Sequence, residues 1–321
     1  MASINHHFVP VMHQRQFAAN KRGEIFVYDK RWQAEPTLKQ PRGQGYEKHL
    51  YSILMNDGVR SSAIEDDHFS KIDNSASLCL DLNPLEGSQH RTTLATYLAS
   101  LIMRNPRLID GLHINSEPLM TEDLQRMLSN PEFRQRLRKR VSSDEEFESM
   151  MAAFAPGKAT AKLTREASML FNFGAMPSVA ECVACCNWTL LLSRETRFIL
   201  SDVPVFTCDP NRVDRSVAGV GIHGNETTLP LTPHKCLLIR PGKPGGFRVR
   251  RASPETVREI NRRSAYASVE RFFASRPDEQ LKMLVNEFPP RPAEQTAFMH
   301  EGLVIMPNLV DNHFFSPIWP S

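Results

Sequence analysis

The stretch TTLATYLASLIMR, at residues 92–104, is apolar on almost every side when it is wound as a helix. A helix without a polar face is stable only where other parts of the chain cover it all round. The stretch stops before Pro106, a residue that disrupts helix interiors. We therefore expect a buried helix at this position.

The regions on either side of this helix differ in periodicity. The runs EIFVYD, WTLLLS, RFILSD, KCLLIR and FRVRR are strand-like, and the gaps at 194–196 and at PGKPGG predict two hairpins. Residues 63–82, 121–155 and 254–275 have helical patterns. This order predicts an α+β fold that is mostly helical, with a small antiparallel sheet built from hairpins in the C-terminal half.

The chain has 321 residues, and we expect residues 1–285 to form a single α+β domain. The Pro-rich residues 286–321 are expected to form a C-terminal tail that packs on this domain. Nothing about the six cysteines indicates an oxidising compartment, so we expect free thiols and a cytoplasmic location. No stretch approaches the ~18 apolar residues of a membrane helix, so no membrane partner is expected.

The formal net charge of +3 is too small to predict a nucleic-acid partner from bulk charge, although it does not exclude one. A small-molecule or nucleotide ligand is compatible with this composition. The sequence sets neither the oligomeric state nor the pathway.

Two adjacent histidines, His6 and His7, precede Pro10, which disfavours a helical conformation at Val9. In an extended segment neighbouring side chains point to opposite faces, so at most one of the pair enters any given pocket. The pair therefore supplies either a hydrogen-bonded core histidine or one catalytic or ligand histidine. His13 lies too far along the chain for a three-histidine metal site.

Glu65 falls on the apolar stripe of the predicted helix 63–82, together with Phe69, Ile72 and Ala76. A carboxylate on an apolar face is costly unless it is paired. Two interpretations stay open: a structural salt bridge to a buried arginine, or a general base or metal ligand.

Asp202 follows a predicted buried strand and precedes Pro204, where it either caps a turn or presents a functional carboxylate. In the predicted helix 254–275, Asn261 and Arg271 lie on one polar line. This line is either solvated or able to donate to a phosphate or a carboxylate.

Several short motifs come in the order of a known bacterial family: HHFVPVMHQRQFA, HFSKID, MRNPR, WTLLLSRETRFILSDVPV, LPLTPHKCLLI and INRRSAYASVERFFAS. From about residue 5 to 276 the chain resembles the family known as domain of unknown function 4238. The resemblance implies a shared site at the matching positions, which are His6, His7, Arg104, Asp202, Pro204, Asn261 and Arg271. The glutamate usual in the family's acidic segment is here Asp73, one methylene shorter, and residues 110–175 match no family motif.

Residues of these types together favour hydrolysis of a phosphate-containing substrate, a nucleotide or nucleic acid, with a divalent metal as a potential cofactor. The predicted catalytic residues are His6, His7, Glu65 and Asp202. The predicted substrate-binding residues are Arg104, Asn261 and Arg271. The alternative is a non-enzymatic ligand-binding or sensing module that uses the same polar pocket.

Overall fold

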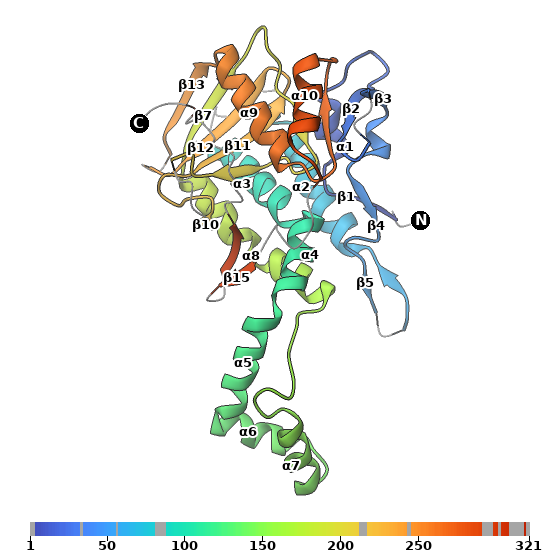
Figure 1. The fold of residues 1–321 in the computed structure, drawn as a ribbon, viewed down its shortest axis with the longest axis vertical. Coiled ribbons are helices and arrows are strands. Elements are labelled where there is room, and N and C mark those ends of the chain that lie inside the picture. The colour runs from blue at the N-terminus through green and yellow to red at the C-terminus, as the bar shows by residue number, and fades with distance from the viewer. Residues whose placement is uncertain are drawn as a thin grey trace.

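The computed structural model describes residues 4–32, 35–55, 57–80, 88–211, 217–242, 245–290, 298–300, 303–307 and 318. Among the described residues, helices follow one another from residue 64 to 185 without an intervening strand, and short strands predominate before and after them (Figure 1). The helical elements are α1 (Val11–Arg15), the 3₁₀ turn η1 (Pro41–Gly43), the π-helix η2 (Ile64–Phe69), α2 (Ser70–Ser77), α3 (Ser88–Met103), α4 (Pro106–Asn115), α5 (Glu117–Ser129), α6 (Pro131–Arg138), α7 (Asp144–Ala153), α8 (Arg165–Cys185), α9 (Pro254–Ala267) and α10 (Glu279–Glu287).

The strands are short and are spread over both halves of the chain. They are β1 (Asn5–His7), β2 (Ile25–Asp29), β3 (Thr37–Lys39), β4 (Tyr46–Lys48), β5 (Ile53–Leu54), β6 (Arg60–Ser61), β7 (Asn187–Leu192), β8 (Leu200–Ser201), β9 (Phe206–Cys208), β10 (Val217–Ala218), β11 (Glu226–Thr232), β12 (Lys235–Arg240), β13 (Phe247–Arg251), β14 (Arg271–Ala274), β15 (Phe298–His300) and β16 (Leu303–Pro307).

Strands from both halves share sheets. The largest has the order β13-β7-β12-β11-β9, and a four-stranded sheet has the order β3-β2-β14-β8. The described strands also form the sheets β10-β16-β15, β1-β4 and β5-β6. The fold is therefore α+β, but the prediction of one small antiparallel sheet in the C-terminal half is wrong. Local patterns cannot show that β2 pairs with β14, since this pairing joins residues that are far apart in the chain.

Both predicted hairpins are also wrong. Strands β7 and β8 lie in different sheets, so residues 194–196 connect two sheets. Strand β13 does not pair with β12 but with β7, in parallel. The reason is that β12 already has β11 at one edge and β7 at the other, which leaves no edge for a hairpin partner.

Helix α3 lies in the centre of the main core, as the sequence predicts. Tyr97, Leu98 and Ala99 have no exposed surface. Helix α8 packs along α3, and one face of the five-stranded sheet contributes Trp188 and Leu237 to the same core. The prediction of a buried helix at 92–104 is confirmed.

The four-stranded sheet has two differently packed faces. One face carries Tyr28 and Phe272 and packs against α9 and α10. The other carries Val27 and Phe273 and packs against the N-terminal segment around Val9. Since Arg271 is opposite Asp29 and Phe273 is opposite Val27, Arg271 and Asp29 project from this second face.

The predicted helix 254–275 ends earlier than its pattern indicates. Helix α9 ends at Ala267, and Ser268 has an extended backbone with φ −61° and ψ 136°. Arg271 therefore begins strand β14 and does not lie on the helix. The interpretation of the polar line as solvated is wrong for Asn261, which is buried together with Ser264 and Ser268.

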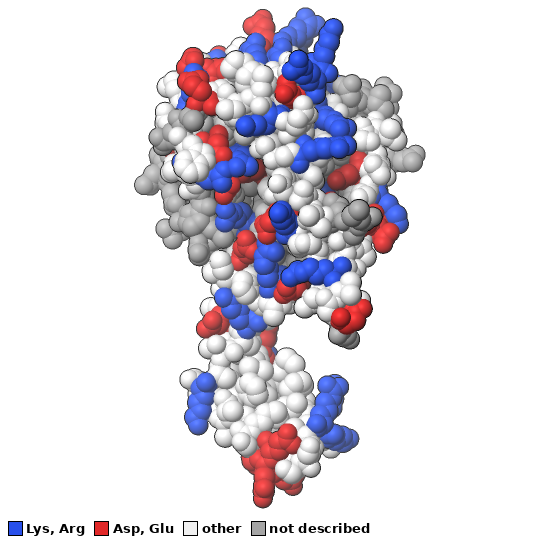
Figure 2. Space-filling model, turned by 90° about the vertical axis from the view of Figure 1, so that its right-hand side faces the viewer, with Lys and Arg blue, Asp and Glu red and all other residues white. Residues whose placement is uncertain are grey.

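Helices α5, α6 and α7 form an arm that extends away from the body of the molecule (Figure 1). Asp and Glu side chains gather at the end of the arm, and Lys and Arg side chains lie on its sides (Figure 2). Helix α7 begins directly after Ser143, whose hydroxyl accepts the Glu146 N–H at 3.1 Å. Of the predicted tail 286–321, Ile318 is buried in a cluster with Val257 and Ile260. That residues 286–321 form a separate tail stays a prediction.

Gly45 is held in a conformation that only glycine adopts without strain. Its φ is +61°, and an added Cβ would lie 2.8 Å from the Val9 Cβ. We expect Gly45→Ala to lower the free energy of unfolding by about 2–5 kcal/mol, from backbone strain plus overpacking. Gly23 has φ +73° with open space around it, so Gly23→Ala is the matched control and costs about 1–2 kcal/mol. The measurement is denaturant unfolding. Equal losses of unfolding free energy for the two variants would show that the contact with Val9 adds nothing to the cost of Gly45→Ala.

Candidate functional site

Three charged residues lie side by side at one end of the four-stranded sheet. Asp29 ends β2, and Arg271, which begins β14, is its direct cross-strand neighbour. Asp202 follows β8, and its N–H donates to the Arg271 carbonyl at 3.0 Å. Residues opposite one another in an antiparallel pair share a face, so the three side chains are neighbours on the sheet.

The Asp202 carboxylate is occupied by backbone N–H groups. One oxygen accepts from Val269 at 2.8 Å, and the other accepts from Glu270 and Arg271 at 2.8 and 2.9 Å. Burial raises the pKa of Asp202, while these three hydrogen bonds act against it and favour the ionised form. Asp202 therefore fixes the turn between α9 and β14, and this turn places Glu270 and Arg271.

Arg271 is oriented from one side only. Its Nε donates to Asp29 at 2.9 Å, and its Nη1 makes a long contact of 3.4 Å with the Gln44 side-chain oxygen. A guanidinium has five N–H donors, so further donors remain for another partner. The side chain is 30% exposed.

Asp29 also holds the turn that follows β2. It accepts from the Arg31 backbone N–H at 3.1 Å and from the Arg31 guanidinium at 2.9 and 2.6 Å. Burial raises the pKa of Asp29, but the hydrogen bonds from Arg31 and Arg271 outweigh it and lower the pKa to about 2. Asp29 is therefore ionised at any ordinary pH.

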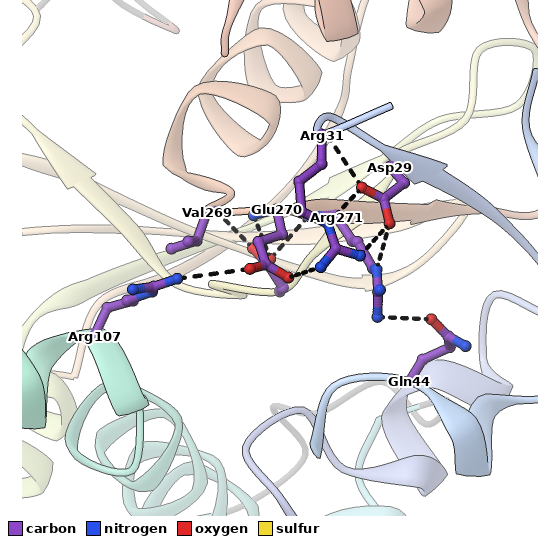
Figure 3. Close-up of polar contacts among 8 residues, drawn as sticks. Asp29, Arg31, Gln44, Arg107, Val269, Glu270 and Arg271 are labelled. Atoms are coloured by element: carbon purple, nitrogen blue, oxygen red, sulfur yellow. Dashed lines mark hydrogen bonds and ion pairs between the residues drawn. The ribbon is translucent and has the colours of Figure 1, made fainter. Parts of the chain in front are cut away.

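Glu270 connects this group to helix α4. Its carboxylate lies 3.1 Å from the Arg31 guanidinium and 3.7 Å from that of Arg107, which belongs to the first turn of α4. Figure 3 shows the resulting chain of contacts from Arg107 through Glu270 and Arg31 to Asp29, with Arg271 reaching away from the sheet toward Gln44.

Arg271 lines two cavities. The first, of about 230 Å³, is also lined by Phe8, Gly45, Tyr46, Glu47, Asn105, Pro106, Arg107, Asp110, Asp202, Val203, Val269, Glu270 and Phe273. The second, of about 310 Å³, is lined by Val27, Asp29, Trp32, Glu35, Thr37, Lys39, Gln44 and Arg271. The guanidinium of Arg271 is thus accessible from both.

A second polar group surrounds Arg104, at the end of the buried helix α3. Its side chain is fully buried and makes a bidentate pair with Asp73 at 2.9 and 3.1 Å. The guanidinium also lies over the rings of Phe69 and Tyr97, at 5.3 and 5.8 Å from their centroids. Burial lowers the pKa of Arg104, but the Asp73 carboxylate outweighs it, so the pKa is raised and the cation persists.

Glu65 and His7 adjoin this pair. Glu65 lies in the π-helix η2, and its buried Oε2 has no hydrogen-bond partner. Burial raises the pKa of Glu65 to about 7, although Arg104 and the His7 backbone amide lower it. Burial lowers the pKa of His7, whose Nε2 lies 3.2 Å from the Arg42 carbonyl. Since π-turns are frequent at functional sites and a pKa near 7 suits proton transfer, Glu65 is the titrating group of this region.

His6 and His7 point to opposite sides of β1, as predicted. His6 is fully buried, accepts the Tyr51 N–H at 2.8 Å through Nδ1, and stacks on the Tyr51 ring. His13 is also fully buried, between the Tyr97 hydroxyl at 2.9 Å and the Pro230 carbonyl at 2.8 Å. Burial lowers the pKa of His13 to about 4, so this histidine is neutral and structural.

Asn261 belongs to neither group. Its side-chain oxygen accepts the Ile199 N–H at 3.0 Å, and its amide donates to the Arg197 carbonyl at 2.8 Å. It ties α9 to the segment that leads into β8.

The structure thus divides the predicted site residues. His6, His7, Glu65 and Arg104 lie in one region, and Asp202 and Arg271 lie in another. The small sheet β1-β4 lies between them: His6 and His7 are opposite Glu47 and Tyr46, which line the 230 Å³ cavity. The sequence analysis did not single out Asp29, Arg31, Trp32, Gln44, Arg107 and Glu270. Asp29 has the same signal as Asp202, an aspartate at the end of a strand, and Arg107 lies within the quoted motif MRNPR.

Within the part of the chain that the structure describes, no three His, Cys, Asp or Glu side chains are placed to hold a metal ion. In the same residues, no helix is long and apolar enough to span a membrane.

These features define an α+β protein with an arginine-centred polar site beside a four-stranded sheet. Residues 5–278 match the sequence model of the family described as "Protein of unknown function (DUF4238)", so the chain belongs to that family and the resemblance in the motifs is confirmed. Comparisons with curated proteins and with solved structures gave no match.

The raised pKa of Glu65 predicts a pH-dependent stability. Its pKa is about 7 in the folded protein and near its ordinary value of 4.5 when unfolded, so the unfolded chain loses this proton first as the pH rises. Stability from this group is therefore present below about pH 4.5 and is lost as the pH rises to about 7. We expect Glu65→Gln to be more stable than wild type at pH 8, by on the order of 1–3 kcal/mol, and the difference to shrink toward pH 4.

The measurement is urea unfolding across this pH range, with the exposed Glu145→Gln as control. A stability difference for Glu65→Gln that does not change with pH would contradict the assignment.

Proposed function

We propose that this protein binds a small phosphate-containing ligand at Arg271. The observation that carries the proposal is the geometry of that side chain. Asp29 fixes Nε, the Gln44 contact of Nη1 is long, and no described residue supplies a partner for Nη2. A guanidinium held in this way presents N–H donors in the fork arrangement that suits a phosphate.

The carboxylates that line the two cavities are already paired, and this pairing supports an anionic ligand. Glu47 and Asp110 are both bound by Arg165, at 2.8 and 2.7 Å. Glu270 and Asp29 are bound by arginines, Glu35 lies 2.7 Å from Lys282, and Asp202 accepts three backbone N–H groups. The groups that can still bond to a ligand are therefore hydrogen-bond donors. They are the Arg271 Nη atoms and the Lys39 ammonium, and the described residues provide no acceptor for this ammonium.

Titration calorimetry with inorganic phosphate and ribose 5-phosphate tests this function. We expect Arg271→Gln to weaken binding of both by roughly 10- to 100-fold, the worth of one or two hydrogen bonds from a charged donor. Arg276→Gln is the matched control, because Arg276 is exposed and contacts only the Glu195 carbonyl. Failure of either probe to bind wild type at millimolar concentration, or equal affinity of Arg271→Gln, would overturn the proposal.

The unpartnered Oε2 of Glu65 and its pKa near 7 favour a second candidate, hydrolysis of a phosphate compound that enters the Glu65 region rather than one held at Arg271. In this candidate Glu65 accepts a proton from the water that attacks the phosphorus, while the bond from phosphorus to the leaving oxygen breaks and that oxygen takes its proton from solvent. His7 lies beside Glu65, to which its backbone amide donates. The buried Arg104 has no role as an anion clamp, because Asp73 occupies its fork. The proposal includes no metal-bound step.

Release of inorganic phosphate from p-nitrophenyl phosphate, followed from pH 5 to 9, tests this candidate. We expect the rate to rise through about pH 7 and Glu65→Gln to abolish that rise, with Asp66→Asn, an exposed neighbour, as control. A rate that is absent, or that Glu65→Gln leaves unchanged, would reject hydrolysis while leaving ligand binding intact.

A further inference from the structure

Trp32 is exposed in a way that the fold does not explain. Its side chain is 74% exposed, more than any other large hydrophobic residue among those described. It lies in the turn after β2 and lines the 310 Å³ cavity together with Arg271 and Lys39. An indole exposed beside two cations offers an aromatic face to a ligand that also carries negative charge.

One residue, Asp29, contacts both Trp32 and Arg271. Asp29 accepts the Arg31 N–H through its side chain, and its own carbonyl accepts the Trp32 N–H at 3.4 Å. The same Asp29 side chain holds the Arg271 Nε. Trp32 therefore lies in the turn that follows Asp29, Arg271 is bound to Asp29 across the sheet, and both line the 310 Å³ cavity.

The two cavities that meet at Arg271 differ in what they offer to the rest of a ligand. Carboxylate residues line both cavities, with Asp29 and Glu35 in the 310 Å³ cavity, but only the 310 Å³ cavity is also lined by Trp32, Thr37 and Gln44. An aromatic face stacks on any nucleobase, and side-chain hydroxyl and amide groups bond to base edges. A phosphate at Arg271 and a planar base on Trp32 would thus occupy one continuous site.

We infer that the ligand of this site is a nucleoside phosphate whose base stacks on Trp32 while its phosphate binds Arg271. This inference rests on the proposed function and specifies the ligand class. Lys39, which faces the same cavity, supplies a second cation for the phosphate.

Tryptophan fluorescence gives a direct readout, because stacking changes the emission of an exposed indole. The chain has three tryptophans, of which Trp188 is buried with its Nε1 bonded to the Val183 carbonyl and Trp319 lies outside the described residues. We expect AMP, GMP, CMP or UMP to quench wild-type emission. Ribose 5-phosphate is expected to bind without quenching, and Trp32→Phe to lose the quenching.

Calorimetry then separates the two halves of the ligand. We expect Trp32→Ala to weaken nucleotide binding by roughly 5- to 150-fold and to leave the affinity for ribose 5-phosphate unchanged. The control is Trp32→Phe, which keeps an aromatic face and most of the nucleotide affinity. A single strand of about ten nucleotides tests whether the base comes from a free nucleotide or from nucleic acid. If the strand binds more tightly than the nucleotides do, and if this binding also depends on Trp32, the ligand is nucleic acid.

Nucleotides that bind no better than ribose 5-phosphate, with Trp32→Ala affecting neither, would overturn this inference and leave phosphate binding standing. If no phosphorylated probe binds, both the inference and the proposed function fail.

Discussion

The Asp29 carboxylate is the interaction on which the site depends. It bonds to Arg31 within its own turn and to Arg271 across the sheet, 242 positions away. Burial alone would make this carboxylate easier to protonate, yet its arginine partners hold its pKa at about 2. Because the charge is permanent, the placement of Arg271 does not vary with ordinary changes in pH.

The sequence predicts local structure here better than it predicts pairing. Periodicity locates β2 and the buried helix α3, and the extended HHFV segment correctly separates His6 from His7. These successes depend on residues within a few positions of one another. The site depends instead on β14 lying between β2 and β8, a contact between distant segments that no local pattern contains. The wrong assignment of Arg271 to a helix has the same cause, since the backbone leaves the helical conformation only three residues before it, at Ser268.

Arg104 shows why residue type alone does not identify a binding group. An arginine near a carboxylate and two histidines suits an anion clamp, but it ends a helix that is apolar all round and so faces the core. The bidentate pair with Asp73 stabilises it there and uses the fork that a phosphate would need. Arg271 also has a carboxylate beside it in the sequence, that of Glu270, yet in the structure a carboxylate binds only its Nε. The two arginines differ in the number of guanidinium N–H donors that have no partner, and only the structure shows this number.

The sheet β1-β4 joins the two polar regions and gives them different roles. One side of it carries His7 toward Glu65, whose proton is lost near pH 7, while Tyr46 and Glu47 line the cavity that contains Arg271. A group with fixed charge is suited to holding a ligand at any pH, and a titrating group is suited to moving a proton. The strand pairing links both regions to one short element, because the backbone amide that donates to Glu65 belongs to His7, and His7 is opposite Tyr46 in β4.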